Sequence, residues 1–204
     1  MNELGEEFST ILEQAVAGDQ PAFELLWRAT HPTLVRYLRV ICGQSAEDVA
    51  SEAWVKAIHA LGSFHGDEQG FRGWLVVIAR NHARDLARYA GRRPEILSSD
   101  LSHEQGRLES DTADVVLERL STQEALRLLS TLPPSQAEMV ALRVVIGLDV
   151  AEVARIVGRS PGAVRVAVHR SLRALAEQLT RSPDGSDEPA VTQQRREALS
   201  RRDV

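Results

Sequence analysis

Two groups of arginines are the side chains of this sequence best suited to do chemistry. One group lies between residues 72 and 93, and the other lies between residues 155 and 181. A guanidinium group binds phosphate, and in the major groove of DNA it can donate two hydrogen bonds to one guanine. The groups therefore predict two surfaces that bind nucleic acid, although solvated helix faces are the alternative. Their members are Arg72, Arg80, Arg84, Arg88, Arg92 and Arg93 in the first group, and Arg155, Arg159, Arg165, Arg170, Arg173 and Arg181 in the second.

The composition indicates an all-α protein. Of the 204 residues, 43% are hydrophobic but only 4% are aromatic, and Leu, Ala, Arg and Glu are abundant, a usage that favours helices over strands. The formal net charge of -5 does not argue against a nucleic-acid partner, because the acids are concentrated at the start of the chain and between residues 95 and 124.

The sequence lacks the patterns typical of catalysis, metal binding or export. His59, His65 and His103 have no metal-ligand spacing, and the single cysteine, Cys42, excludes an internal disulfide. Ser, His and Asp are present without a nucleophile elbow. There is no long apolar run and no export leader. We therefore expect a cytoplasmic protein that is not an enzyme, has no catalytic residues, metal or cofactor, and does not insert into a membrane.

The second arginine group lies in a segment with the signals of a helix-turn-helix. Asp149 and Glu152 form a capping box at the start of one helix. Gly158 permits a sharp turn after it. Ser160 can cap the next helix, with Pro161 at the first position, where a missing backbone N–H costs nothing. Two capped helices joined by so short a turn are typical of DNA-binding proteins.

The second helix of this motif has one apolar face and one basic face. At about 100° per residue the apolar residues gather on one side, which we expect to be buried. The opposite side suits insertion into a major groove, although an Arg-rich solvated helix of an ordinary bundle is the alternative. The apolar face holds Val164, Val168, Leu172, Leu175 and Leu179, and the opposite face holds Arg165, Val166, His169, Arg170 and Arg173.

The first arginine group lies on a long helix predicted over residues 70–91. Arg80, Arg84 and Arg88 recur at steps of four and form one basic stripe, and Asn81 beside it could hydrogen-bond to a base edge. Asp85 is expected to form an ion pair within the helix. The opposite, core-facing side holds Phe71, Trp74, Leu75, Ile78, His82 and Leu86.

Shorter helices are expected before this long one. Apolar spacing predicts two short helices before Pro32 and a third between Pro32 and Gly43. Ser45 and Asp48 resemble a capping box and would open a further helix, which Gly62 can close.

A polar segment divides the chain into two predicted domains. Residues 94–114 are acidic and rich in Ser and lack apolar periodicity, which is typical of a flexible linker. The predicted domains are residues 1–93 and 115–181, and the tail 182–204 is expected to be disordered. So polar a linker should keep the two basic surfaces apart instead of packing them into one core.

Two stretches of the sequence resemble one known family. Residues 45–93 resemble region 2 of the extracytoplasmic-function sigma factors of the sigma-70 family, with the sequence SAEDVASEAWVKAIHALGSFHGDEQGFRGWLVVIARNHARDLARYAGRR. Residues 128–179 resemble region 4 of the same family and include LPPSQAEMVALRVVIGLDVAEVARIVGRSPGAVRVAVHRSLRAL. The resemblance implies a transcription initiation factor that binds core RNA polymerase and directs it to promoters by minus-10 and minus-35 recognition and promoter melting.

The resemblance also implies roles for matched positions. In relatives, the helix around Asp48 docks on the clamp helices of the largest catalytic subunit of the polymerase. The loop from Phe64 to Phe71 matches one that captures a base flipped from the minus-10 element. The implied contacts are Asp48, Glu52, Trp54 and Val55 for core polymerase, Phe64, Arg80, Asn81, Arg84 and Arg88 for minus-10 DNA, and Arg165, Val166, His169, Arg170 and Arg173 for minus-35 DNA.

One departure from the family pattern falls on the recognition helix. Relatives often carry Thr-Val-Lys-Ser-Arg where this chain has Ala163-Val164-Arg165-Val166-Ala167, so contact of Val166 with a thymine methyl could replace polar readout. An anti-sigma factor is the usual further partner in this family. A helix-turn-helix regulator that binds DNA without polymerase, and an enzyme of unknown type, are the alternatives.

Overall fold

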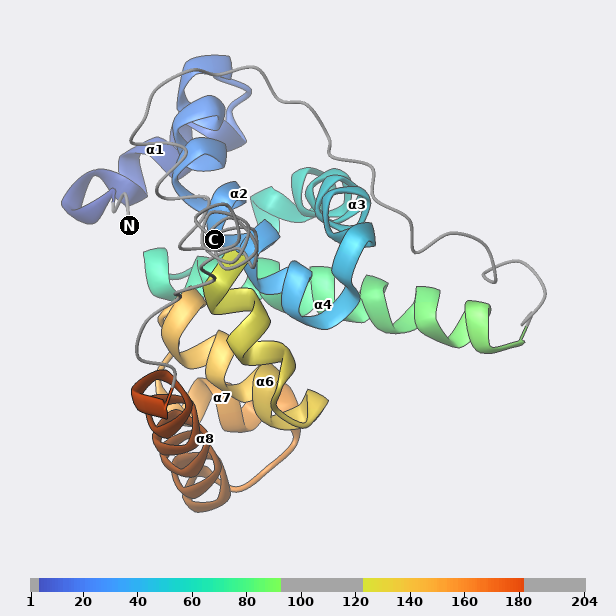
Figure 1. Cartoon of the computed structure of the whole chain (residues 1–204). Coiled ribbons are helices and arrows are strands. Elements are labelled where there is room, and N and C mark those ends of the chain that lie inside the picture. The colour runs from blue at the N-terminus through green and yellow to red at the C-terminus, as the bar shows by residue number, and fades with distance from the viewer. Residues whose placement is uncertain (1–3, 93–122, 182–204) are drawn as a thin grey trace, which may run out of the picture. The chain divides into compact units, whose positions relative to one another are not determined.

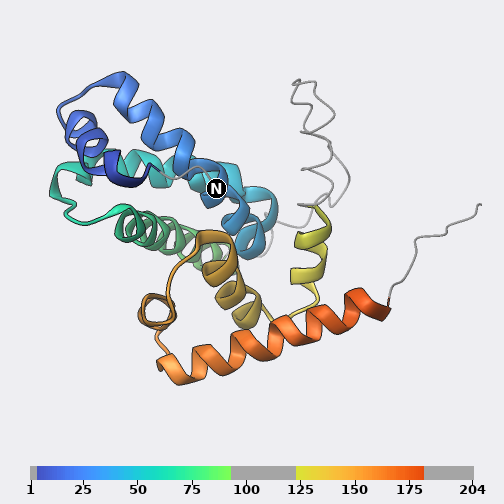
Figure 2. The same cartoon turned by 90° about the vertical axis from the view of Figure 1, so that its left-hand side faces the viewer.

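The computed structural model describes residues 4–92 and 123–181, and within these ranges every regular element is a helix (Figures 1 and 2). The all-α prediction is therefore confirmed for the described part of the chain. Contacts divide the described residues into two units, which are residues 4–92 with 123–172, and residues 173–181. The predicted linker and the predicted tail lie outside the described residues.

The helices of residues 4–92 are joined by short turns. Helix α1 packs on α2, and α2, α3 and α4 pack against one another (Figure 1). The elements are α1 (Phe8–Val16), α2 (Gln20–Cys42), α3 (Ala46–Ala60) and α4 (Glu68–Arg92), with 3-10 turns at Gly5–Glu7, Gly43–Ser45 and Leu61–Ser63.

Helix α2 is continuous where the sequence predicted a new helix after Pro32. A proline inside a helix removes one backbone hydrogen bond and crowds the preceding turn. Pro32 itself is exposed, but its neighbours Ala29, Thr30, Thr33 and Leu34 are buried against the rest of the bundle. Packing of these four side chains keeps both halves of α2 in one helix, so the predicted break is wrong.

An aromatic cluster fills the core beneath α1, α3 and α4. Phe71 lies at its centre and is 0% exposed. The distances between its ring centroid and those of Phe8, Trp54, Phe64 and Trp74 are 5.7, 6.3, 5.4 and 5.6 Å. Tilted and edge-to-face pairs at such distances are favourable for aromatic rings beyond the burial of their area. Phe71 therefore joins three helices and the loop before α4.

The start of the chain is held by the first turn of α4. One carboxylate oxygen of Glu68 accepts hydrogen bonds from the backbone N–H groups of Leu4 and Gly5, each at 3.0 Å. The other oxygen accepts from the Arg72 side chain. A single carboxylate thus satisfies two N–H groups at the entrance to α1.

The elements after the predicted linker are also helical. Residues 123–130 form a helix, and Gly147 in the left-handed conformation (φ 85°) ends the π-helical turn that precedes α7. The elements with defined bounds are α6 (Pro134–Ala141), the π-helical turn Leu142–Ile146, α7 (Val150–Val157) and α8 (Pro161–Arg181).

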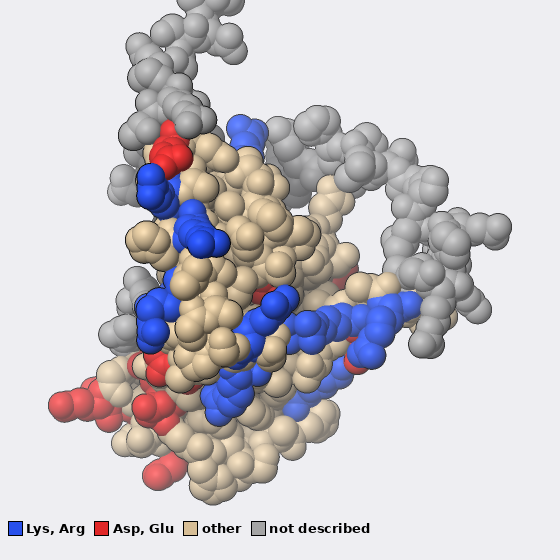
Figure 3. Space-filling model, turned by 90° about the horizontal axis from the view of Figure 1, so that it is seen from below, with Lys and Arg blue, Asp and Glu red and all other residues tan. Residues whose placement is uncertain are grey.

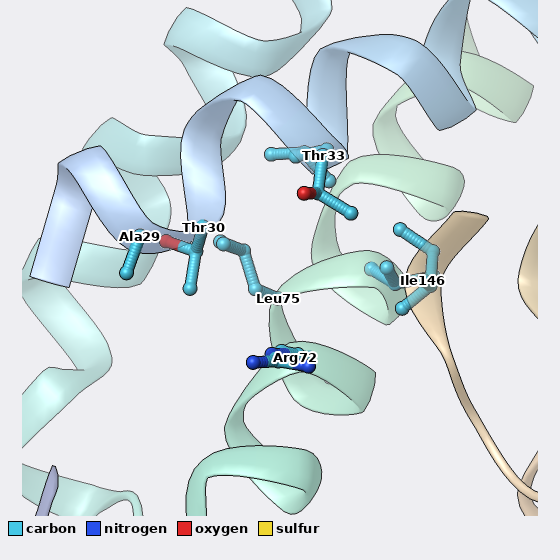
Figure 4. A pocket seen from close by; sticks show the side chains of 8 residues that line it. Ala29, Thr30, Thr33, Arg72, Leu75 and Ile146 are labelled. Atoms are coloured by element: carbon cyan, nitrogen blue, oxygen red, sulfur yellow. The ribbon is translucent and has the colours of Figure 1, made fainter. Parts of the chain in front are cut away.

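Residues from both sides of the predicted linker share one hydrophobic core within residues 1–172, which corrects the expectation that they would stay apart. Helix α6 and the π-helical turn pack on α2. Figure 4 shows a pocket of this contact, in which Ile146 approaches Thr33 of α2 and Leu75 of α4. The polar composition of the linker was a poor guide to this packing, because the apolar contact is made by helices that lie before and after the linker in the sequence.

Candidate nucleic-acid interface

The local geometry of the helix-turn-helix follows the prediction. The Asp149 side chain accepts from the Glu152 N–H at 2.8 Å, and the Glu152 side chain accepts from the Asp149 N–H at 3.1 Å. Gly158 has φ 71° and ends α7 in the left-handed conformation. The Ser160 hydroxyl oxygen accepts from the Ala163 N–H at 3.2 Å. The capping box, the turn and the second cap are therefore confirmed.

The cap that the sequence predicted at Ser45 is wrong. The Ser45 side chain makes no capping hydrogen bond. The residue belongs to the 3-10 turn Gly43–Ser45, which runs directly into α3 with helical backbone angles at Ala46. A continuous turn leaves Ser45 without the extended conformation that side-chain caps usually adopt.

Replacement of Asp149 by Ala is expected to lower the free energy of unfolding by about 1 kcal/mol, because it removes a side-chain cap. Chemical denaturation followed by circular dichroism measures this change. The control is Asp85→Ala, which breaks an exposed ion pair and should change stability by about 0.5 kcal/mol or less. Equal stability of the two variants would mean that the capping box adds nothing to the motif.

The predicted reading face of α8 is exposed in residues 1–172. Arg165, Val166, His169 and Arg170 all point away from the core, whereas Val164 is fully buried. These four side chains are brought together on one solvent-facing surface, as the sequence predicted. The fifth predicted residue, Arg173, belongs to the second unit, is exposed and donates to Glu177 at 3.0 Å.

The buried face of α8 differs from the prediction at two positions, Leu172 and Leu179. Leu172 is 41% exposed, and the neighbouring Ser171 is buried instead. The Ser171 hydroxyl lies 3.0 Å from the side-chain oxygen of Gln136 in α6, to which it donates. Leu179 is exposed as well. Ser171 is therefore buried because it has a polar partner in α6. Apolar periodicity alone could not identify it as a buried residue.

The basic stripe of α4 is shorter than predicted. Asn81, Arg84 and Arg88 are exposed, and Arg88 forms the expected ion pair with Asp85. Figure 3 shows Lys and Arg gathered over one face of the molecule, with most of the Asp and Glu in that view lying to one side. Arg84 and Arg88 are both exposed to solvent, where a phosphate can reach them, and the ion pair of Arg88 with Asp85 is itself exposed.

Arg80 is the exception, because its side chain is buried and not part of the exposed stripe. It is 5% exposed and donates from Nε and Nη2 to the two carboxylate oxygens of Glu138 in α6, at 2.5 and 3.2 Å. The Tyr37 hydroxyl donates to Glu138 at 3.2 Å. Sequence reasoning missed Tyr37 and Glu138, because neither lies near Arg80 in the chain.

Burial and charge act together in this group. Burial alone would lower the pKa of Arg80, but the hydrogen bond and the charge of Glu138 outweigh it and raise that pKa. Burial raises the pKa of Tyr37, and the charge of Glu138 raises it further. Arg80 therefore stays charged and Tyr37 stays a hydrogen-bond donor at neutral pH.

The predicted base-capture loop borders a cleft of about 690 Å³. The Phe64 ring contacts those of Phe71 and Trp74, with centroid distances of 5.4 and 5.3 Å. Asp67 accepts from the Gly70 N–H at 2.8 Å and so caps α4. The cleft is lined by Ser63, Phe64, His65, Gly70, Gly73, Trp74, Val77, Arg80, Asn81, Arg155 and Ile156.

Three of the four residues predicted to contact polymerase lie on the surface of α3. Asp48, Glu52 and Val55 are exposed. Trp54 is 4% exposed and packs edge-on against Phe23, at a centroid distance of 5.7 Å. Trp54 therefore lies in the core beneath α3 and not on the exposed surface, and its contact with polymerase stays a prediction.

His82, expected to pack in the core, is half-buried, and its Nδ1 lies 3.0 Å from the Lys56 amine.

The sequence predicted neither a metal site nor a segment that inserts into a membrane. Within residues 4–92 and 123–181, no three His, Cys, Asp or Glu side chains cluster as metal ligands would. No helix in these ranges is long and apolar enough to cross a membrane.

Comparison with known proteins identifies the family. The sigma-70 region 2 family matches residues 26–93, and the sigma-70 region 4 family matches residues 122–175. The chain is 35% identical to the ECF RNA polymerase sigma factor SigD of Mycobacterium tuberculosis (strain ATCC 25618 / H37Rv) over 90% of this chain and 89% of that protein. It is 36% identical to the ECF RNA polymerase sigma factor BldN of Streptomyces coelicolor over 83% of this chain, but spans only 64% of BldN.

A solved structure agrees with these sequence matches. CnrH, determined in complex with the cytosolic domain of CnrY, superposes with a TM-score of 0.58 and 25% identity, over 87% of this chain and 100% of the other. The resemblance drawn from the sequence is confirmed. The chain belongs to the extracytoplasmic-function RNA polymerase sigma factors, a family of promoter-specific initiation factors of transcription.

Proposed function

We propose that this chain binds core RNA polymerase through α3, reads and melts the minus-10 element with α4 and the loop before it, and reads the minus-35 element with α8. It performs no catalysis of its own. The observation that carries the proposal is the exposed face of α8, on which Arg165, Val166, His169 and Arg170 project from a capped helix-turn-helix. The spacing of these side chains along one helix suits a major groove.

The minus-10 side of the proposal rests on α4 and on Phe64. Asn81, Arg84 and Arg88 offer one amide and two guanidinium groups on an exposed face. Phe64 and Trp74 both line the cleft of about 690 Å³. Aromatic rings at the edge of a cleft suit a DNA base that has been flipped out of the base stack. Arg80 can join these contacts only after it leaves Glu138.

The proposed polymerase surface is the exposed side of α3, with Asp48, Glu52 and Val55. Two carboxylates beside an exposed apolar side chain suit a partner surface that is basic with an apolar centre. An anti-sigma factor is a further proposed partner. The complex of CnrH with the cytosolic domain of CnrY supports a polypeptide partner for a protein of this fold.

The proposed domain limits place region 2 in residues 1–93, a linker in 94–114, region 4 in 115–181 and a tail in 182–204. Matches of the region 2 and region 4 families to residues 26–93 and 122–175 support the first and third of these limits. We also propose a cytoplasmic location, where RNA polymerase and promoter DNA are found.

Run-off transcription on genomic fragments can first identify promoters that the holoenzyme uses. If polymerase holds the minus-10 surface of α4 and the minus-35 surface of α8 at a fixed distance, three results are expected on these promoters. The isolated chain should footprint weakly, the holoenzyme should footprint specifically, and transcription should fall sharply when the promoter spacer changes by several base pairs. The reason is that the second contact is productive only when its site lies within reach of the first.

The spacer series also separates this function from that of a polymerase-independent regulator. Tight, sequence-specific footprinting by the chain alone, unaffected by the spacer, would contradict the proposal. Absence of the chain from purified core polymerase after mixing would contradict it as well.

A further inference from the structure

The Glu138 carboxylate binds the edge of the Arg80 guanidinium group that can hold an anion by two hydrogen bonds. It meets Nε and Nη2 of Arg80 through both of its oxygens, at 2.5 and 3.2 Å. A carboxylate held bidentately by a guanidinium is a close chemical counterpart of a phosphate held by the same group. While this pair is closed, Arg80 is buried and cannot bind a second anion.

A second polar contact holds the same two parts of the chain together. The Gln69 side chain, at the start of α4, donates to Glu152 of α7 at 2.7 Å. Glu152 is also the carboxylate of the capping box. Arg155 and Ile156 of α7 line the cleft beside Phe64 and Asn81. The packed form therefore narrows access to the proposed minus-10 surface as well as hiding Arg80.

Tyr37 is a further hydrogen-bond donor to the Glu138 carboxylate. Its hydroxyl donates to Oε1 of Glu138, the oxygen that also receives Arg80 Nε. Tyr37 is fully buried in α2, so the donor is fixed in place by its packing. Three donors from α2 and α4 thus converge on one carboxylate of α6.

We propose that Glu138 is an intramolecular inhibitor, whose carboxylate competes with promoter phosphate for Arg80 and holds the chain in a closed form that must open before DNA binds. This inference rests on the proposed role of Arg80 at minus-10 DNA. Opening exchanges one anion on Arg80 for another, so the closed form can yield to DNA without leaving the guanidinium unpaired.

The test compares binding of a short single-stranded DNA oligonucleotide of mixed sequence by full-length variants. Glu138→Gln is expected to bind at least about tenfold more tightly than the unchanged chain, because apparent affinity is proportional to the fraction of open molecules. The logarithmic salt dependence should steepen by about 0.7, as expected when one more phosphate is neutralised on a single strand. The exposed pair Glu24–Arg28 supplies the matched control, Glu24→Gln, which removes the same charge and should leave binding almost unchanged.

Two further variants make the outcome decisive. The gain should disappear in Glu138→Gln/Arg80→Gln, in which the freed guanidinium is absent. Tyr37→Phe, which keeps the ring and removes one donor to Glu138, should give a smaller gain in the same direction and serves if Glu138→Gln does not fold. Equal binding by the Glu138 and Glu24 variants, or a gain that survives the loss of Arg80, would overturn the inference.

Run-off transcription with core polymerase separates this inference from the proposed function. If the unchanged chain directs promoter-specific transcription but Glu138→Gln gains no affinity for DNA, only the inhibitory role of Glu138 fails. If the unchanged chain directs no transcription with core polymerase, the proposed function fails first.

Discussion

The double variant Arg165→Ala/Arg170→Ala is expected to lose about 30-fold or more in affinity for minus-35 DNA when bound to core polymerase. Each good contact of a side chain with a base edge contributes about 1 to 3 kcal/mol, and the two residues lie more than one helical turn apart. Both side chains are exposed, so their removal leaves the core of the helix-turn-helix intact. Transcription from a promoter that depends on its minus-35 element should fall in parallel.

A matched pair of arginines on another helix controls for the loss of charge. Arg28→Ala/Arg36→Ala removes two guanidinium groups from α2, where Arg28 pairs with Glu24 and Arg36 donates to a backbone carbonyl of its own helix. This control should retain the affinity for minus-35 DNA. If both double variants lose affinity equally, α8 contributes only general charge and the assignment of its reading face is wrong.

Phe71→Ala is expected to lower the free energy of unfolding by about 3 to 5 kcal/mol, the largest effect on stability anticipated for this chain. Phe71 is 0% exposed and its ring is surrounded by those of Phe8, Trp54, Phe64 and Trp74. A loss of this size is a large fraction of the total stability of a typical domain, about 5 to 15 kcal/mol. Chemical denaturation monitored by tryptophan fluorescence measures it.

Leu86→Ala on the same helix is the matched comparison. The sequence predicted both side chains on one core face, but Leu86 is 42% exposed. Its truncation should therefore cost about 1 kcal/mol or less, because little apolar area is returned to water. Similar losses for the two variants would contradict the position of α4 in the bundle.

The features that the sequence predicted well are local ones. Asp149, Glu152, Gly158 and Ser160 act on backbone groups within a few residues of themselves, so their spacing contains almost all the information needed. The exposed face of α8 was predictable for the same reason. Helical periodicity determines which residues share a side, and Val164 established which side is buried.

The features that the sequence did not predict depend on distant partners. Arg80 follows the same spacing as Arg84 and Arg88, but its partner Glu138, 58 residues further along the chain, makes its environment different. Periodicity also could not show that Ser171 is buried in preference to Leu172, because its partner lies in α6.

The predicted break at Pro32 failed for a related reason. The local cost of proline in a helix is real, but packing of the buried residues around it outweighs that cost. Trp54 is a second example. Val55, the next residue of α3, is exposed, and the sequence did not show that Trp54 itself faces Phe23. In each case tertiary contacts decide what local preference leaves open.

The hydrogen bonds from Leu4 and Gly5 to Glu68 have a consequence for the order in which the helices pack during synthesis. The backbone N–H groups of Leu4 and Gly5 find their acceptor 64 and 63 residues later, and Phe8 packs against Phe71 in the same part of α4. These native contacts cannot form until α4 has left the ribosome, although α1 is made first. Helix α1 can therefore pack on α2 early, but it completes its contacts only once α4 has been made.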